Sequence, residues 1–182
     1  MIVFRNCDRR WPFMWESPNQ PAARWHADGE GPAQYLADTP DGAWAEFLRH
    51  EEIEDPIDLA GVERSLWVVD VHIDDPVRPN LPRETLIGSP IGSPGAYPQC
   101  QAEARRLRDA GADALQAPSA ALEPRSAGGY RVERGFRSGP SRDGVVFVLF
   151  GTRPDAVGWQ VVDRGRPPTE VLDRVRPLAA AT

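Results

Sequence analysis

The sequence predicts a mixed α+β fold. Short runs of apolar and β-branched residues, which are typical of strands, outnumber the helical segments along the 182 residues. The two kinds of segment do not alternate regularly, as they would in a doubly wound parallel fold. A chain of this length can bury one sizeable core, whereas two domains would each be small. We therefore expect a single domain over residues 1–182, with its core at about 2–163.

The chain begins with an apolar run, "MIVF", which predicts a short buried strand that ends at Arg5. A loop rich in aromatic residues and proline is expected at 6–23, because its three prolines exclude a regular helix. Trp11, Phe13 and Trp15 either attach this loop to the core or line a ligand cleft.

Two short strands, "RWH" (24–26) and "QYLAD" (34–38), are predicted on either side of the turn sequence "ADGEGP". A helix from Pro40 to Glu51 follows, because Thr39 offers a side-chain oxygen as N-cap and proline suits the first helical position. The apolar face of this helix carries Trp44, Phe47 and Leu48.

The second half of the chain contains the strongest interior strand, "SLWVVDVHI" (65–73), whose alternation predicts one face with Trp67, Val69 and Val71. A flexible loop is expected at 74–98, either as a mobile surface loop or as a lid over a site. A helix in "QCQAEARRLRDAGA" is predicted to stop at Gly111. The remaining predicted elements are a short strand in "DALQAPSAAL" (113–122), strands at 144–150 and 158–163, and a C-terminal short helix (168–175) and tail.

Charge and composition limit the partners that the chain can have. The formal net charge is −6 and the pI is near 5.1, so no overall positive field attracts nucleic acid or an anionic membrane. All 21 basic residues are arginine, which excludes a lysine Schiff base but leaves arginines to bind phosphate. No apolar run approaches the roughly 20 residues of a membrane span, and a cytoplasmic location is expected. Cys7 and Cys100 are expected to be free thiols, and no metal site is predicted.

Five polar residues at the predicted ends of strands or beginnings of helices are candidates for a site. They are Arg5, Arg24, Tyr35, Glu46 (off the apolar helix face) and Ser119. Each alone has an ordinary structural explanation, such as an edge charge, a solvated acid or a turn serine. Together they suffice to hold a dinucleotide pyrophosphate and to stabilise positive charge on a sugar. Nicotinamide is already cationic in NAD, so its departure needs no general acid but requires a carboxylate near the oxocarbenium ion.

The same residues lie in motifs that resemble the RES domain, a family named for its Arg, Glu and Ser. The arginine, tyrosine and glutamate are spaced evenly, 11 residues apart, as 35 − 24 = 11 and 46 − 35 = 11. The matching motifs are "FR" at Phe4–Arg5, "ARW" ending at Trp25, "YLADTP" from Tyr35, "AWAEFLRH" around Glu46, "APSA" around Ser119 and "GVVFVLF" at 144–150. The resemblance implies an ADP-ribosyltransferase-like mixed sheet with flanking helices. It also implies a bacterial toxin of a toxin–antitoxin system that consumes NAD by phosphorolysis or hydrolysis and arrests growth.

The resemblance further implies a role for each candidate residue. Arg5 and Arg24 would bind the diphosphate and the nicotinamide-side ribose, with Trp25 beside them in the NAD site. Tyr35 would pack against a ring or sugar, and Ser119 would donate a hydrogen bond to a phosphate or ribose oxygen.

Glu46 would hold a ribose hydroxyl and stabilise the cationic sugar. NAD would be the substrate and inorganic phosphate a possible co-substrate, with no resident cofactor and no metal. The implied partner is a separate antitoxin protein.

Two other functions stay open at this point. One is a mono-ADP-ribosyltransferase that modifies a protein target, and the other is an inactive NAD- or partner-binding module. A homo-oligomer is also possible, with Trp11 and Trp15 as contact points. His26 stands where the family more often has a small polar residue.

Overall fold

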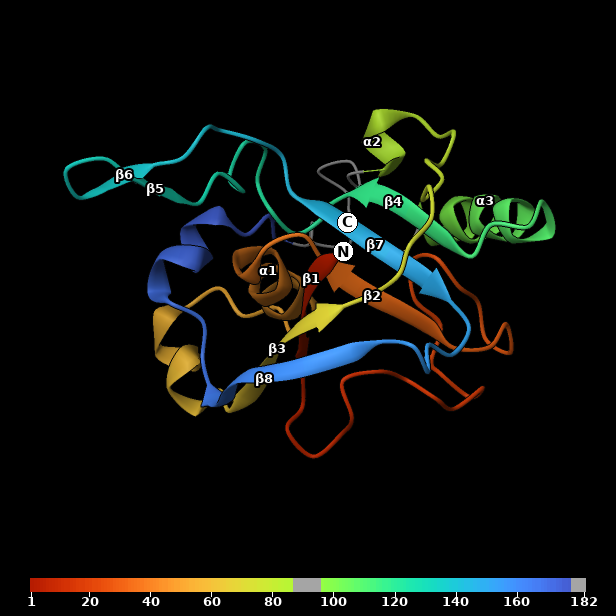
Figure 1. The fold of residues 1–182 in the computed structure, drawn as a ribbon, viewed down its shortest axis with the longest axis horizontal. Helices are drawn as coiled ribbons and strands as arrows, with labels where there is room; N and C mark the ends of the chain where they lie inside the picture. Colours follow the sequence, from red (N-terminus) through yellow and green to blue (C-terminus); the bar gives the residue numbers. More distant parts are fainter. Residues whose placement is uncertain (87–95, 178–182) are drawn as a thin grey trace.

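The protein is described by a computed structural model that covers residues 1–86 and 96–177 (Figure 1). Its centre is an antiparallel six-stranded sheet with the order β4-β7-β2-β1-β3-β8, flanked by helices, so the predicted mixed α+β fold is confirmed. The strands of the sheet are β1 (Ile2–Cys7), β2 (Ala33–Ala37), β3 (Arg64–Asp70), β4 (Ala114–Pro118), β7 (Val145–Phe150) and β8 (Val157–Gly165). The helices are α1 (Pro40–His50), α2 (Arg83–Leu86), α3 (Tyr97–Asp109) and the 3₁₀ helices η1 (Pro56–Gly61) and η3 (Thr169–Arg174). A separate hairpin is formed by β5 (Tyr130–Val132) and β6 (Phe136–Ser138).

The sheet opens between β1 and β2. These two strands pair at one position, Phe4 with Ala37, whereas β1 pairs with β3 along its full length and β2 pairs with β7 along its full length. Beyond Phe4 the two strands diverge, which divides the sheet into a half with β4, β7 and β2 and a half with β1, β3 and β8.

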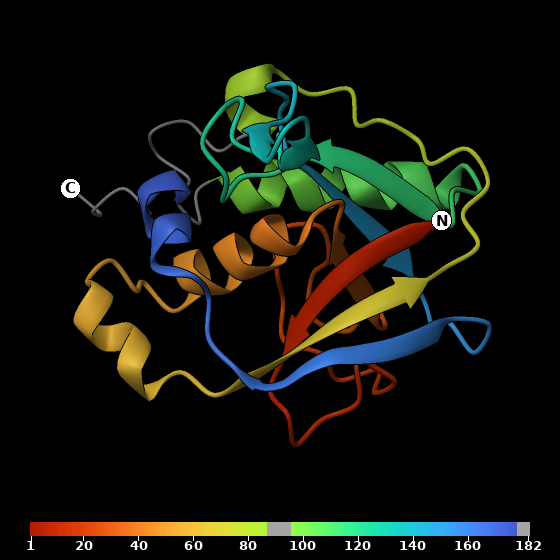
Figure 2. The same cartoon turned by 60° about the vertical axis from the view of Figure 1, so that its left-hand side comes forward.

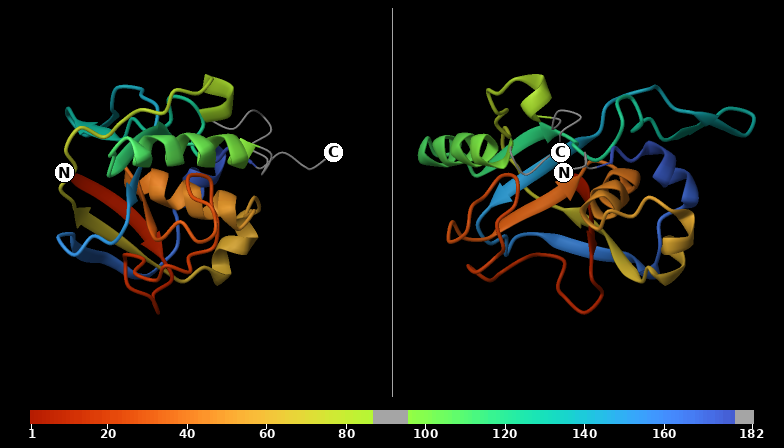
Figure 3. Two further views of the ribbon diagram at one scale, coloured as in Figure 1. Left: turned by 90° about the vertical axis from the view of Figure 1, so that its right-hand side faces the viewer. Right: turned by 180° about the vertical axis from the view of Figure 1, so that it is seen from behind.

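Two helices cover the sheet near this opening (Figure 2 and Figure 3). Helix α1 packs into a core cluster that includes Leu66 of β3, and α3 packs into a second cluster that includes Leu115 of β4 and Val148 of β7. Helix α1 lies closest to the opening because it contacts both β1 and β2, whereas α3 packs on the half of the sheet with β4 and β7.

Helix α1 begins and ends almost where the sequence predicts. Thr39 is the N-cap, and its Oγ1 accepts a hydrogen bond of 3.0 Å from the backbone N–H of Gly42. Pro40 occupies the first turn, where its missing N–H costs no helical hydrogen bond. Trp44 and Leu48 are buried and Phe47 is half-buried, which confirms the predicted apolar face.

The predicted alternation holds only at the end of β3 and just beyond it, where Val69 and Val71 are buried and Asp70 is exposed. Earlier in the strand Ser65 and Leu66 are both buried, and Trp67 and Val68 are both half-buried.

The predicted loop at 6–23 begins two residues later than expected, because β1 continues beyond Arg5 to Cys7. The loop is attached to β3 through Phe13, which stacks on Trp67 with 4.9 Å between ring centroids. Trp11, in contrast, is 65% exposed. Neither Phe13 nor Trp11 lines the cavity described below.

The predicted strand at 24–26 is wrong. Ala23 and His26 form an isolated bridge that closes a tight turn, with Ala23 N–H bonded to the His26 carbonyl at 3.0 Å. The run "RWH" has strand-like composition but only three residues, too few to override the turn signals around it. Arg24 therefore lies on a turn and not at a strand edge.

Several predictions need smaller corrections. The loop expected at 74–98 contains the one-turn helix α2 and the first residues of α3, and its segment 87–95 lies outside the described residues. The C-terminal helix is the 3₁₀ helix η3, and η1 and the β5–β6 hairpin were not predicted. Cys7 and Cys100 are buried free thiols, as expected. Within the described ranges, no helix has the length and apolar character needed to cross a membrane.

Candidate active site

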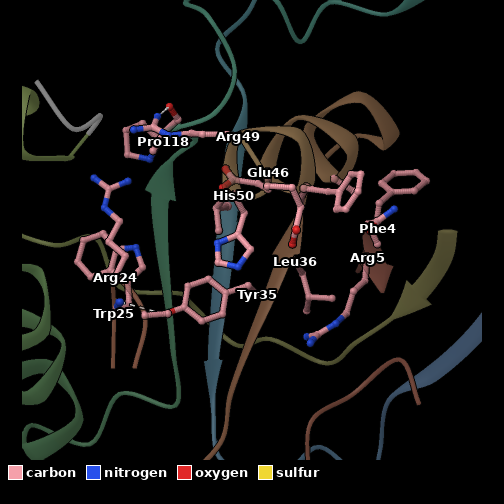
Figure 4. Close-up of a pocket in the computed structure, with 18 of the residues that line it drawn as sticks. Phe4, Arg5, Arg24, Trp25, Tyr35, Leu36, Glu46, Arg49, His50 and Pro118 are labelled. Carbon is pink, nitrogen blue, oxygen red and sulfur yellow. Dashed lines mark hydrogen bonds between the residues drawn. The ribbon is translucent and has the colours of Figure 1, made fainter. Parts of the chain in front are cut away.

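A cavity of about 330 Å³ lies where β1 and β2 diverge (Figure 4). Its walls combine both halves of the sheet with α1, and they include Arg5 of β1, Tyr35 of β2, Glu46 of α1 and Arg64 of β3. Figure 4 shows Arg24 and Arg5 on opposite sides, with Tyr35 between them and Glu46 reaching in from α1. The volume is at the lower end of the range of about 300–1,000 Å³ that small-molecule sites occupy.

Glu46 is a half-buried acid of helix α1 that lines the cavity, and a serine far away in the sequence binds its carboxylate. Ser119 Oγ donates a hydrogen bond of 2.9 Å to Glu46 Oε1 across 73 residues of chain. The same Oγ accepts the backbone N–H groups of Ala121 and Leu122 at 3.2 and 3.1 Å. These two bonds occupy the oxygen's lone pairs, so its proton is available for the carboxylate.

Ser119 is 5% exposed and lies behind Glu46, outside the residues that line the cavity. This geometry favours a positioning role for Ser119, in place of the predicted direct bond to a phosphate or ribose. The other candidates, Arg5, Arg24, Trp25, Tyr35 and Glu46, all line the cavity.

Arg5 lies at the opening between the two strands. Its Nη1 donates to Gln34 Oε1 at 3.2 Å, and the same oxygen, on a fully buried side chain, also accepts the Trp15 N–H at 2.7 Å. Burial lowers the pKa of Arg5 to about 10, so the guanidinium stays charged at neutral pH. The ion pairs of the described chain do not include Arg5. A half-buried cation with a neutral partner is stabilised when an anion enters the cavity.

Arg24 and Trp25 form the opposite wall. Arg24 Nη2 donates to the carbonyl of Thr85 at 2.7 Å and to that of Leu86, at the end of α2. Its guanidinium also lies 5.3 Å from the ring centroid of Trp25, which is 1% exposed and packs against α3. The turn at 23–26 is therefore held between α2 and α3, which sets the position of Arg24 at the cavity.

Tyr35 presents its ring to the cavity while its hydroxyl holds the same turn. The hydroxyl oxygen accepts the Trp25 N–H at 2.9 Å and lies 3.0 Å from Nδ1 of the fully buried His26. His26 Nε2 is 2.9 Å from the Pro21 carbonyl, which can only accept, so Nε2 carries the proton. Burial lowers the pKa of His26, which keeps the ring neutral, and Nδ1 then accepts the Tyr35 proton.

Burial also raises the pKa of Tyr35, so its hydroxyl stays protonated. This chain of bonds explains why histidine suits position 26: it links the tyrosine hydroxyl to the loop before it. The arrangement agrees with a packing role for the Tyr35 ring and leaves its hydroxyl no proton to transfer to a ligand.

Comparison with known protein families identifies the family to which these motifs belong. The model of the RES domain matches residues 3–168. The chain belongs to the RES domain family. The match begins at the second residue of β1 and ends just before η3, so it includes every residue of the cavity wall. A comparison with curated proteins gave no match.

The RES domain cavity contains further charged residues that sequence reasoning did not place there. Arg49 is 8% exposed and donates to the Ala120 carbonyl, and burial lowers its pKa. It follows Glu46 by three residues, and this helical spacing was the available signal. Arg64 donates through Nε to Asn6 Oδ1 at 2.8 Å and lies over the Phe47 ring at 4.6 Å. No local signal marks Arg64, because only the pairing of β3 with β1 brings it to the site.

The charge balance of the RES domain cavity opposes that of the whole chain. Four arginines and two glutamates line it, an excess of two positive charges in a chain of net charge −6. In the described part of the chain, no three histidine, cysteine, aspartate or glutamate side chains gather to hold a metal ion. The arrangement can therefore attract an anionic ligand and place one fixed carboxylate beside it.

Proposed function

We propose that this RES domain binds NAD in the cavity and cleaves its nicotinamide–ribose bond. The observation that carries the proposal is the Glu46 carboxylate, held by Ser119 at 2.9 Å, on the wall of a cavity rich in arginine. The RES resemblance supports it, because characterised members of the family consume NAD. The cavity is also large enough to take much of such a ligand.

In the proposed reaction the bond between ribose C1′ and the nicotinamide nitrogen breaks, and its electron pair goes to the ring nitrogen. Nicotinamide leaves as a neutral molecule, so no residue has to protonate it. The ribose becomes an oxocarbenium ion, and Glu46 stabilises it. A water molecule or a phosphate oxygen then forms the new bond to C1′, and for water the released proton goes to solvent.

The carboxylate supplies the largest single contribution. A full charge about 4 Å from the developing cation is worth about 4 kcal/mol at an effective dielectric constant near 20. A barrier change of that size corresponds to roughly a 10³-fold change in rate. Ser119 adds to this by keeping one carboxylate oxygen in place before the reaction begins.

The arginines on the two sides of the cavity supply binding. Arg5 and Arg24 lie on opposite walls, and a guanidinium can donate two parallel hydrogen bonds to phosphate oxygens. The half-buried Tyr35 ring offers a flat apolar surface beside them. In a cell, NAD depletion would arrest growth, and a separate antitoxin would block the cavity.

The test is incubation of the purified protein with NAD, with and without inorganic phosphate, and identification of the products by mass spectrometry. Nicotinamide with ADP-ribose 1-phosphate is the product pair of a phosphorylase, and nicotinamide with ADP-ribose is that of a hydrolase. Either pair supports the proposal. Absence of nicotinamide under both conditions contradicts it and leaves transfer to a protein acceptor, or binding alone, as the function.

A pair of matched variants locates the chemistry. Glu46→Gln should reduce nicotinamide release roughly 10³-fold while NAD still raises the melting temperature, because the shape of the cavity is kept. Glu54→Gln makes the same chemical change at an exposed position away from the cavity and should leave the rate unchanged. Full activity in Glu46→Gln would remove the carboxylate from the mechanism.

A further inference from the structure

The β5–β6 hairpin extends from the body of the molecule as an arm, residues 128–139 (Figure 1). Three apolar side chains on it are more than two thirds exposed: Tyr130 at 71%, Val132 at 81% and Phe136 at 83%. They share one face, since Val132 pairs with Phe136 and the Tyr130 and Phe136 rings meet edge to face at 6.2 Å. An apolar face this exposed is typical of a surface that contacts another protein.

The opposite face of the arm is cationic. Arg131 pairs with Arg137 across the hairpin, and Arg134 lies in its turn. Glu133 is the one acid of the arm, and it lies 3.4 Å from Arg131. Three arginines and one glutamate leave the arm with two net positive charges, although the whole chain has −6.

The base of the arm holds it in one direction. A Cβ on Gly139 would lie 2.2 Å from the Gly128 carbonyl oxygen, so the two backbones cross at a distance that only glycine permits. The Gly139 N–H donates to the Gly129 carbonyl at 2.9 Å beside this crossing. A hairpin with three residues in each strand is marginally stable alone, so burial of its apolar face would stabilise it.

A surface with the complementary character lies on the same chain. The acidic segment, residues 51–58 (EEIEDPID), has five carboxylates and no basic residue, and its Ile57 is 76% exposed. It joins α1 to η1 and includes the first turn of η1. Figure 1 and Figure 3 place the arm and η1 at the same end of the molecule, so one partner can reach both.

We propose that two copies of this chain form a two-fold symmetric dimer in which the arm of each copy lies on the acidic segment of the other. The aromatic face of the arm covers the exposed isoleucine, and the long arginine side chains reach around the edges of the two-stranded hairpin to the carboxylates on either side of it. The symmetry repeats the contact and closes the assembly at two copies. Each aromatic side chain buries about 150–250 Å², and with both arms and both receiving surfaces counted the total reaches the order of 1,600 Å², a standard interface.

The test uses charge reversal and measures mass by sedimentation or light scattering. The wild-type chain should be a dimer of 20.1 kDa subunits whose dissociation constant rises with salt. The arm variant Arg131→Glu/Arg137→Glu and the segment variant Glu54→Arg/Asp58→Arg should each be monomers. An equimolar mixture of the two variants should return to the dimer mass, because both contacts of the mixed dimer then pair opposite charges.

Trp11→Ser is the matched control, since it removes an exposed aromatic ring outside both surfaces and should leave the dimer intact. Recovery of the dimer on mixing also shows that both variants fold. A monomeric wild-type chain at micromolar concentration, or an arm variant that keeps the dimer mass, overturns the proposal. The measurement does not involve NAD, so its result is separate from that of the proposed function.

Discussion

The Tyr35 hydroxyl gives a direct way to separate structure from catalysis in this site. In the structure the hydroxyl accepts the Trp25 N–H at 2.9 Å and donates to Nδ1 of His26 at 3.0 Å, while the ring lines the cavity. Tyr35→Phe keeps the ring and removes the oxygen alone. It therefore leaves the cavity wall intact but takes a partner from two groups in the turn at 23–26.

The expected cost follows from the burial of those two groups. Trp25 is 1% exposed and His26 is fully buried, so neither finds bulk water when the hydroxyl is lost. A buried polar group left without a partner costs about 1–3 kcal/mol. Two such groups, with some relaxation of the turn, give a loss of about 3 kcal/mol in the free energy of unfolding. For a domain of this size the melting temperature should fall by about 6–12 °C.

The assay is thermal and urea unfolding of Tyr35→Phe beside the wild-type protein and the control Tyr130→Phe. Tyr130 is 71% exposed, so its variant should unfold within about 0.5 kcal/mol of the wild type. At a temperature where Tyr35→Phe is folded, its rate of NAD cleavage should stay within a few-fold of the wild-type rate. Unchanged stability together with loss of cleavage would refute the reasoning, because it would give the hydroxyl a catalytic role in place of a structural one.

Three further predictions concern the same site and its supports. Ser119→Ala removes the hydrogen bond that holds Glu46, and a hydrogen bond to a charged group is worth about 1.5–3 kcal/mol. Steady-state kinetics should therefore show a kcat lower by about 10- to 100-fold with KM little changed. An unchanged kcat would contradict the positioning role of Ser119. Burial lowers the pKa of His26 below its usual 6.5, so as the pH falls the His26 ring is protonated in the unfolded chain before it is protonated in the folded one. The stability that the neutral ring contributes above about pH 6.5 is therefore lost below that pH. Urea unfolding between about pH 7 and pH 5 should show a steeper loss in the wild type than in His26→Gln, by at most about 1.4 kcal/mol per pH unit, and parallel profiles would count against a neutral His26. Phe13→Ala should lower the free energy of unfolding by about 2–3 kcal/mol, because the Phe13 ring stacks on Trp67 of the sheet. Trp11→Ala should change the free energy of unfolding by less than about 0.5 kcal/mol, because Trp11 is exposed. Urea unfolding measures both, and equal effects would show that the loop is not attached through Phe13.

The predictions that succeeded rest on short-range physics. Thr39 and Pro40 define the beginning of α1 because a capping oxygen and a fixed proline φ act within one turn. The alternation around Val69 identifies β3 because successive side chains of a strand point to opposite faces. The strand predicted at 24–26 was wrong because a run of three residues has too little local signal to decide between a strand and a turn.

Sequence alone therefore determined the fold class, the helix with its glutamate, most strands of the sheet and the family to which the motifs belong. Only the tertiary structure decided that β1 and β2 diverge, that Ser119 lies behind Glu46 and not on the cavity wall, and that Arg64 joins the site. It also decided that the arm and the acidic segment share one end of the molecule. The physical reason is that caps, turns and side-chain periodicity act between residues close in the chain, whereas strand register and the meeting of residues 73 positions apart depend on how the whole core packs.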